Sequence, residues 1–153
     1  MLRALPWLML VGVLLAAMPA TQDTATRTET TGPRFVAWDV FVDSSTASLG
    51  AYQFEWKVLS GDATIVGVEG GAHPAFADAP YYDEVALQRQ RILIGAFSTA
   101  AELPTGETRV ARIHLMVEGP EEPEYQILLQ AVADGEGADI TASTTKKRWK
   151  RER

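Results

Sequence analysis

The chain contains neither cysteine nor asparagine among its 153 residues. Without cysteine, disulfide bonds and lipid attachment to a cysteine are both excluded, so the fold has to be stabilised by packed apolar side chains. Without asparagine, the usual sequon for N-linked glycosylation cannot occur. Histidine is scarce, with only two residues, and a metal centre would therefore need unusual ligands.

Sequence motifs for catalysis are missing as well. There is no Gly-x-Ser-x-Gly motif and no cysteine nucleophile, and His114 alternates with apolar neighbours, which places it on the outer face of a strand. We therefore expect no enzyme activity, no catalytic residue, no metal site and no cofactor. The alternative is a hydrolase that uses carboxylates of a long loop, and its candidate residues are Asp78, Asp83 and Glu84.

The net charge of −6 is unevenly distributed along the chain. Residues 146–153 hold six basic residues and one glutamate, whereas residues 21–145 hold 7 basic and 19 acidic residues. An acidic body repels phosphate groups, so nucleic acid is not an expected partner. The basic tail, residues 144–153, is expected to be disordered and could make weak contact with anionic lipid.

The N-terminal region has the pattern of an export signal. Arg3 is followed by an apolar run from Ala4 to Met18, which is short for a membrane span and typical of a signal peptide. Residues 1–20 are therefore predicted to be a signal peptide, with an uncleaved N-terminal anchor as the alternative. Residues 21–33, rich in threonine, are predicted to be a flexible linker. The expected location is outside the cell or in the cell envelope.

Alternating apolar residues predict β-strands through most of the remaining chain. In residues 51–59, four large side chains alternate with polar ones and share one face: Tyr52, Phe54, Trp56 and Val58. The other predicted strands are Arg34–Asp43, Ala63–Glu69, Arg91–Ser98, Thr108–Glu118 and Glu124–Ala133, with a possible short last strand in Ala138–Ser143. Turn residues separate the strands, and amphipathic helices are missing. This pattern indicates an all-β fold, an antiparallel β-sandwich of jelly-roll type.

One long connection interrupts the strands, at about residues 70–88. It contains two glycines and two prolines, with one helical turn expected in Asp83–Leu87, and loops of this length are often functional. Its aromatic residues are candidate exposed rings: Phe76, Tyr81 and Tyr82. The alternative is that the loop folds back and these rings close one end of the sandwich. Trp38 and Trp56 lie on apolar strand faces and are expected in the core.

Residues 34–143 resemble a cohesin domain, the bacterial sandwich module that docks dockerins and belongs to the same superfamily as certain cellulose-binding modules. The Gly50–Trp56 segment is similar to the "aaYdfeL" strand of that family. Further similar segments, in the order of the family, are Ile65–Gly71, Ile92–Ser98 and Gly106–Val117. The resemblance implies a jelly-roll sandwich that binds another protein.

The expected function is therefore a non-catalytic binding module, outside the cell or in the envelope, that docks a dockerin-like or other protein partner. Tyr81 and Tyr82 would be the anchors, because tyrosine combines a broad apolar ring with a hydroxyl group. Arg91, Arg112 and His114 would supply polar contacts. The alternative is a carbohydrate-binding module that recognises a polysaccharide through the aromatic residues of the long loop. Contact with a membrane is expected only through an uncleaved N-terminal segment or the tail.

Overall fold

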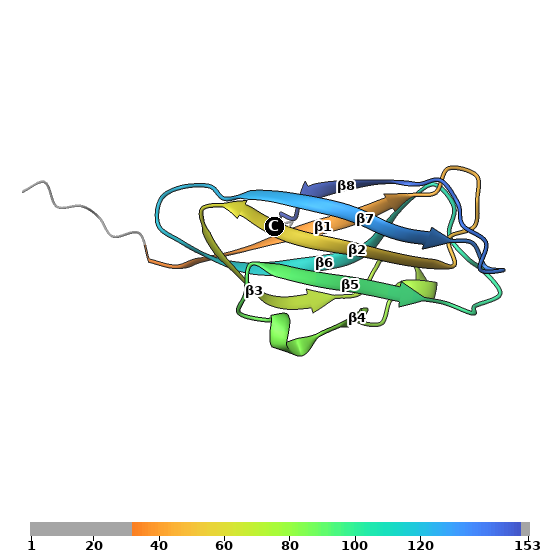
Figure 1. Ribbon diagram of the computed structural model, residues 1–153, viewed down its shortest axis with the longest axis horizontal. Coiled ribbons are helices and arrows are strands. Elements are labelled where there is room, and N and C mark those ends of the chain that lie inside the picture. The colour runs from red at the N-terminus through yellow and green to blue at the C-terminus, as the bar shows by residue number, and fades with distance from the viewer. Residues whose placement is uncertain (1–31, 151–153) are drawn as a thin grey trace, which may run out of the picture.

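The computed structural model describes residues 32–150, and the signal peptide and most of the linker predicted from the sequence lie outside them. Within residues 32–150, no helix has the length and apolar character needed to cross a membrane. The described chain forms strands and two short 3-10 helices (Figure 1). The elements are β1 (Arg34–Asp43), β2 (Ala51–Ser60), β3 (Asp62–Glu69), η1 (Pro74–Phe76), β4 (Tyr81–Tyr82), η2 (Glu84–Ala86), β5 (Arg91–Phe97), β6 (Glu107–Glu118), β7 (Glu124–Ala133) and β8 (Ser143–Arg148).

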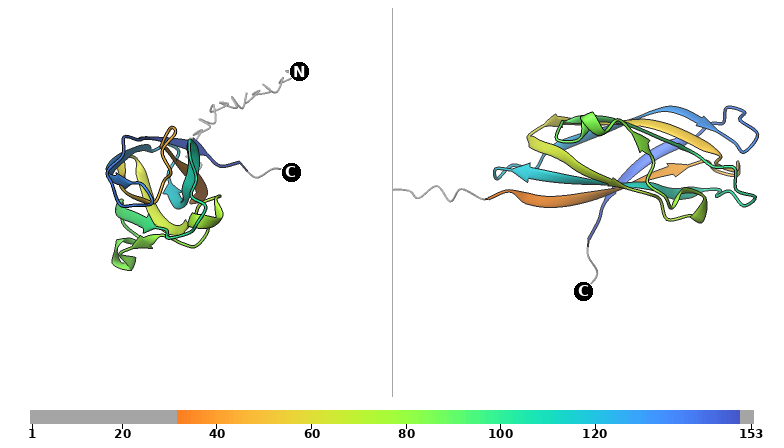
Figure 2. Two further views of the ribbon diagram at one scale, coloured as in Figure 1. Left: turned by 90° about the vertical axis from the view of Figure 1, so that its right-hand side faces the viewer. Right: turned by 90° about the horizontal axis from the view of Figure 1, so that it is seen from below.

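The strands form two antiparallel sheets that pack face to face (Figures 1 and 2). We call them sheet A, in the order β3-β6-β1-β8, and sheet B, in the order β4-β5-β2-β7. Neighbouring strands pair antiparallel throughout, so the predicted all-β antiparallel sandwich is confirmed. The finer assignment to the jelly-roll type stays a prediction.

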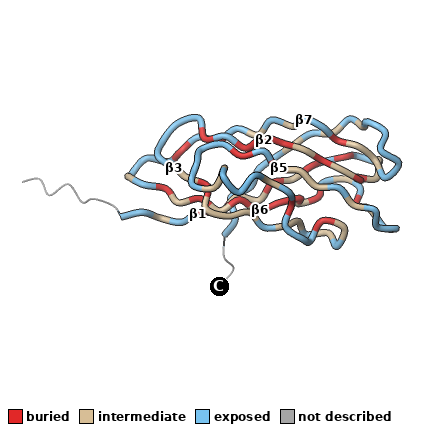
Figure 3. The backbone as a smooth tube through the Cα atoms, turned by 60° about the horizontal axis from the view of Figure 1, so that its bottom comes forward, coloured by how far each residue is buried: buried red, intermediate tan, exposed pale blue. Residues whose placement is uncertain are grey.

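The core lies between the sheets and is built from alternate residues of the strands (Figure 3). All four apolar residues predicted to share a face of β2 are buried, and Phe54 and Trp56 have no exposed surface. From β6, alternate residues point inward to meet them, except at a bulge where Val110 and Ala111 are both buried. The residues of β6 with no exposed surface are Val110, Ala111, Ile113, Leu115 and Val117. Each such side chain contributes roughly 1.5–3 kcal/mol by leaving water, which compensates for the missing disulfides.

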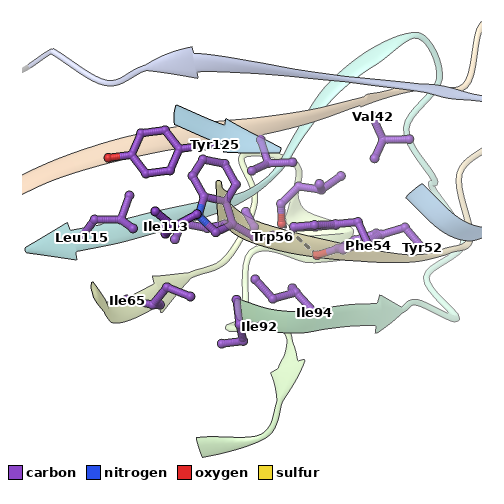
Figure 4. Close-up of a cluster of buried hydrophobic side chains, with 14 of the residues drawn as sticks. Val42, Tyr52, Phe54, Trp56, Ile65, Ile92, Ile94, Ile113, Leu115 and Tyr125 are labelled. Carbon is purple, nitrogen blue, oxygen red and sulfur yellow. Dashed lines mark hydrogen bonds between the residues drawn. The ribbon is translucent and has the colours of Figure 1, made fainter. Parts of the chain in front are cut away.

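Two tryptophans and a tyrosine pack together inside the sandwich. The ring of Tyr125 lies 5.1 Å from that of Trp56 and 5.5 Å from that of Trp38, measured between centroids. Trp38 is partly buried and packs against the core, so both indoles lie where the sequence predicts them. Burial raises the pKa of the Tyr125 hydroxyl. Figure 4 shows Tyr125 above Trp56, close to Ile113 and Leu115 of the facing sheet.

The C-terminal strand corrects one prediction. Residues 144–153 are predicted to be disordered, but residues 144–148 belong to β8, which pairs with β1 along Trp38–Asp43, whereas residues 151–153 lie outside the described residues. The sequence of β8 has no apolar alternation, so its pairing depends on the open edge of β1 and on charge. Lys147 forms an ion pair of 2.5 Å with Glu107, and Arg148 one of 2.8 Å with Glu122. The short strand predicted for Ala138–Ser143 is wrong, because that segment makes a single β-bridge at Asp139 before β8 begins.

The long connection between β3 and β5 is structured. Its predicted helical turn is confirmed as η2, whose first backbone groups are capped by the side chain of Asp83. The two residues of β4 pair with β5 and extend sheet B, a pairing that the sequence did not predict. Because β4 belongs to the sheet, the side chains of Tyr81 and Tyr82 point to opposite faces of sheet B.

Candidate functional site

Exposed apolar residues gather on the outer face of sheet B. Eight large apolar residues are exposed within residues 32–150, and four of them lie on this face. We call these four the apolar face, and they are Tyr81 of β4, Leu93 and Phe97 of β5, and Leu128 of β7. Isolated exposed apolar residues are normal, but a contiguous group is typical of an interaction surface.

The strand register places these residues in rows across the sheet. One row runs from Leu93 through Glu55 to Leu128, since Glu55 of β2 pairs with both neighbours. The next row runs from Tyr81 through Gly95 to Gln53. Residues directly opposite each other in antiparallel strands share a face, so each row lies on the outer face of sheet B. Glu55 is buried between the two exposed leucines, where Arg91 binds its carboxylate.

A groove with a volume of ≈ 590 Å³ crosses this face. The floor of the groove is formed by residues at outward-facing positions whose side chains are too small to fill it: Ala51, Gly95, Ala131 and Ala133. At Gly95, an added Cβ would lie 3.3 Å from the carbonyl oxygen of Tyr52, so even a methyl group would be tight there. Tyr81, Leu93 and Phe97 form the wall on one side. The groove is therefore apolar at its base and open to solvent.

The wall is built around two stacked aromatic rings. The rings of Tyr81 and Phe97 lie 6.1 Å apart between centroids, with an angle of 11° between their planes. Both are largely exposed, Tyr81 at 72% and Phe97 at 65%. Stacking holds the two side chains together, so less side-chain freedom remains to be lost when a partner covers them.

Polar groups on the same face are mostly paired with each other. Arg91 donates two hydrogen bonds of 2.7 Å to the carboxylate of Glu55. These bonds outweigh the effect of desolvation and lower the pKa of Glu55 below its ordinary value. Gln53 donates a hydrogen bond of 2.9 Å to Gln130. Arg91, which is predicted to contact the partner, lies on this face, but its guanidinium is bound by Glu55.

The loop before β4 packs the ring of Phe76 against the core. Phe76 is only 3% exposed, and its ring meets that of Tyr52 edge-on at 5.3 Å between centroids. Below it, the Tyr52 hydroxyl donates a hydrogen bond of 2.9 Å to the carbonyl oxygen of Val110, and burial raises the pKa of this hydroxyl. Phe76 therefore closes one end of the sandwich. The prediction of Phe76 as an exposed binding residue is wrong, and the alternative of a plugging ring is correct for it.

Tyr82 also departs from its predicted role. It lies opposite Ile94, which is buried, and packs against the core with partial burial. Tyr82 is therefore directed inward, whereas its neighbour Tyr81 is exposed. The predicted exposure is confirmed for Tyr81 and wrong for Tyr82, because β4 is a strand and alternates its side chains. The role of Tyr81 as an anchor stays a prediction.

Two predicted polar contacts lie on the other sheet. Arg112 binds the carboxylate of Asp39 through two hydrogen bonds of 2.7 and 3.2 Å and lies 4.7 Å from the ring centroid of Trp149. His114 is on the outer face, as predicted, and makes a contact of 2.8 Å with Glu69. Both residues belong to β6 in sheet A, so they form no common site with Tyr81 and Arg91.

Several residues of the apolar face were not predicted from the sequence. Leu93, Phe97 and Leu128 lie at outward positions of strands whose inward positions are also apolar. The sequence does contain an indication of these residues, because β5 and β7 are apolar on both faces. Such a pattern indicates that each face of the strand is covered, by the core or by another surface. The sequence shows that pattern but not which of the two faces remains exposed.

The fold and the site place the protein in the class of antiparallel β-sandwiches, with an exposed apolar face on one sheet. No protein-family model, curated protein or solved structure matches the chain. Within residues 32–150, no group of three or more His, Cys, Asp or Glu side chains is arranged to hold a metal ion.

Proposed function

We propose that this protein is a non-catalytic binding module that docks a protein partner on the outer face of sheet B. The observation that carries the proposal is the concentration of Tyr81, Leu93, Phe97 and Leu128 on that face. Protein interfaces have a central apolar region with aromatic anchors and a polar rim. Here the apolar face supplies the apolar region and the aromatic anchors, and the paired Glu55 and Arg91 add a polar group between Leu93 and Leu128.

The cohesin-like sequence segments support the same class of function. A dockerin-like module is the partner that this resemblance implies, and an exported protein would meet it outside the cell or in the envelope. The apolar face adds a physical reason, because leucines at positions 93 and 128 offer aliphatic surface without hydrogen-bonding groups. Such surface is better matched by the apolar side chains of a protein than by the hydroxyl groups of a sugar.

A polysaccharide is the second candidate ligand. The stacked pair of Tyr81 and Phe97 offers an exposed aromatic surface, and the amides of Gln53 and Gln130 lie on the same sheet. A sugar could stack on the rings and exchange hydrogen bonds with the amides. Polysaccharide binding would explain the exposed aromatic pair but not the exposed leucines, so it is the second candidate.

Site-specific photo-cross-linking tests the proposal in cells that make the protein. A benzophenone-bearing phenylalanine analogue is placed at position 128, on the apolar face, and at position 118 of β6 as the control. Both positions are exposed, but Glu118 is on sheet A. We expect a protein adduct of defined mass from position 128 and none from position 118.

The same samples separate the two candidates. Purified protein is incubated with insoluble polysaccharides, and retention is compared with that of the Tyr81→Ala variant. Retention that is lost in Tyr81→Ala, together with no protein adduct at position 128, would replace the protein partner with a carbohydrate. An adduct at position 118 and none at position 128 would contradict the assignment to sheet B.

A further inference from the structure

The groove on sheet B is acidic as well as apolar. Among the described residues that line it, the charged ones are Asp83 and Asp139, and no lysine or arginine lines it. Asp83 follows β4 at one edge of the sheet, and Asp139 bridges to Ala133 beside β7 at the other edge. The two carboxylates therefore lie at opposite ends of the groove, with the apolar floor between them.

Neither carboxylate is neutralised by a cation within residues 32–150. Asp83 accepts a hydrogen bond of 2.9 Å from the backbone N–H of Val85, which caps η2 and leaves its charge in place. The side chain of Asp139 makes no hydrogen bond or ion pair with other described residues, and it is exposed. Arg89 and Arg91 line a neighbouring hollow together with Asp83, but neither forms an ion pair with it within residues 32–150, and Arg91 is held by Glu55. The groove thus presents to a partner two carboxylates that have no ion-pair partner among the described residues.

The dimensions of the groove limit what can fill it. From Asp83 it crosses the four strands of sheet B to Asp139, which lies one position beyond β7, and at about 4.8 Å between neighbours this spans roughly 19 Å. An extended segment rises about 3.3 Å per residue, so five residues cover roughly 13 Å, and long side chains at both ends reach across the rest. Side chains of an extended segment alternate, and the first, third and fifth therefore point to the same side.

We infer that the partner docks through an extended segment with one large apolar side chain flanked two residues away on each side by lysine or arginine. This inference rests on the proposed function and specifies the chemistry of its partner. The apolar side chain lies on the floor of Ala51, Gly95 and Ala131, against the rings of Tyr81 and Phe97. The two cations reach Asp83 and Asp139, and opposite charges at both ends fix the register of the segment.

Three synthetic peptides test the inference with the whole protein. They are capped, fluorescein-labelled peptides centred on Lys-Thr-Phe-Thr-Lys, Glu-Thr-Phe-Thr-Glu and Lys-Thr-Ser-Thr-Lys, and Kd is measured by fluorescence anisotropy at low and physiological salt. We expect the first peptide to bind at least about tenfold tighter than either of the others, with a preference over the acidic peptide that decreases as salt rises.

Two pairs of variants assign the binding to the groove. Ala131→Trp fills the floor and is expected to raise Kd for the first peptide at least about tenfold, whereas Gln126→Trp, on the same strand outside the groove, leaves it unchanged. Asp139→Lys is expected to reduce the preference for the basic peptide about fivefold or more. Glu136→Lys, in the same turn but outside the groove, is the control and keeps the preference.

Equal binding of the basic and acidic peptides, or unchanged binding in Ala131→Trp, would overturn the inference. Failure of all three peptides to bind would overturn it as well. If position 128 still cross-links to a protein in that case, the proposed function stands and only the chemistry of the partner is wrong. If the cross-link is also absent, both are wrong.

Discussion

Trp56 is the residue on which the core depends most directly, since it has no exposed surface and contacts Tyr125. Replacing it by alanine leaves a cavity between the sheets, and Trp56→Ala is expected to lower the free energy of unfolding by about 3–5 kcal/mol. Urea denaturation followed by circular dichroism measures the change. Trp149→Ala is the control, because this tryptophan is 39% exposed. Its replacement is expected to lower the free energy of unfolding by less than about 1 kcal/mol. Equal losses in both variants would contradict the placement of Trp56.

The ion pair of Glu55 with Arg91 makes stability depend on pH. The hydrogen bonds from Arg91 lower the pKa of Glu55 in the folded state below the ordinary value of 4.5. The stabilisation is therefore fully present above that ordinary value and is lost as pH falls through the lowered folded-state pKa. Urea denaturation at pH 7 and pH 3 should show a larger loss of stability for the natural protein than for Glu55→Gln. An identical loss in both would show that this pair does not contribute.

At the scale of single residues, the sequence identified Tyr81 but missed its partner Phe97. Tyr81 lies in a segment with the composition of a loop, and an aromatic ring in a loop is predicted to be exposed. Phe97 is the last residue of an apolar strand, and such a strand can be buried on both faces. Phe76 was misassigned for a related reason. Its burial depends on contact with Tyr52, 24 positions earlier in the chain, and no local pattern reports such a contact.

Among the elements, β8 is held mainly by its backbone pairing and by charge. Lys147 and Arg148 pair with Glu107 and Glu122, and no side chain of β8 is fully buried. In a variant with Lys147→Glu and Arg148→Glu, both attractions become repulsions. We expect roughly tenfold faster amide hydrogen exchange across β8, with β2 still protected. Lys150→Glu is the matched control.

Two outcomes would count against this account of β8. Exchange in the double variant that equals that of the natural protein would show that the ion pairs do not hold the strand. Loss of protection throughout β2 would show that β8 is needed for the whole sandwich, and not only for one edge of sheet A.

The strands with alternating apolar residues could be predicted from the sequence almost to their ends, as β1, β2 and β7 show. Each of these strands buries one face, which requires apolar residues at every second position. This alternation can be recognised within the strand itself, without knowledge of its neighbours. The two strands that were missed lack that pattern. β4 has only two residues, and β8 is polar on both faces, so each exists because a neighbouring strand offers an open edge.

At the scale of the whole molecule, the outer faces of the two sheets differ. On sheet A, Arg109 and Arg112 interact with Asp39, and Trp149 covers part of the surface. On sheet B, Tyr81 and Phe97 stand exposed above a groove. The sandwich itself could be predicted from the sequence, but this difference could not, because it results from where β4 and the C-terminal segment pack.

The central claim is that sheet B and not sheet A carries the docking surface, and partner retention by matched variants tests it most directly. Tagged protein with Tyr81→Ser and Phe97→Ser is compared with Phe35→Ser, which removes a 73% exposed ring from β1 of sheet A. Co-purifying proteins are quantified by mass spectrometry against the natural protein. We predict that the double variant loses the partner at least tenfold, whereas Phe35→Ser keeps it. Retention by the double variant and loss in Phe35→Ser would contradict the account.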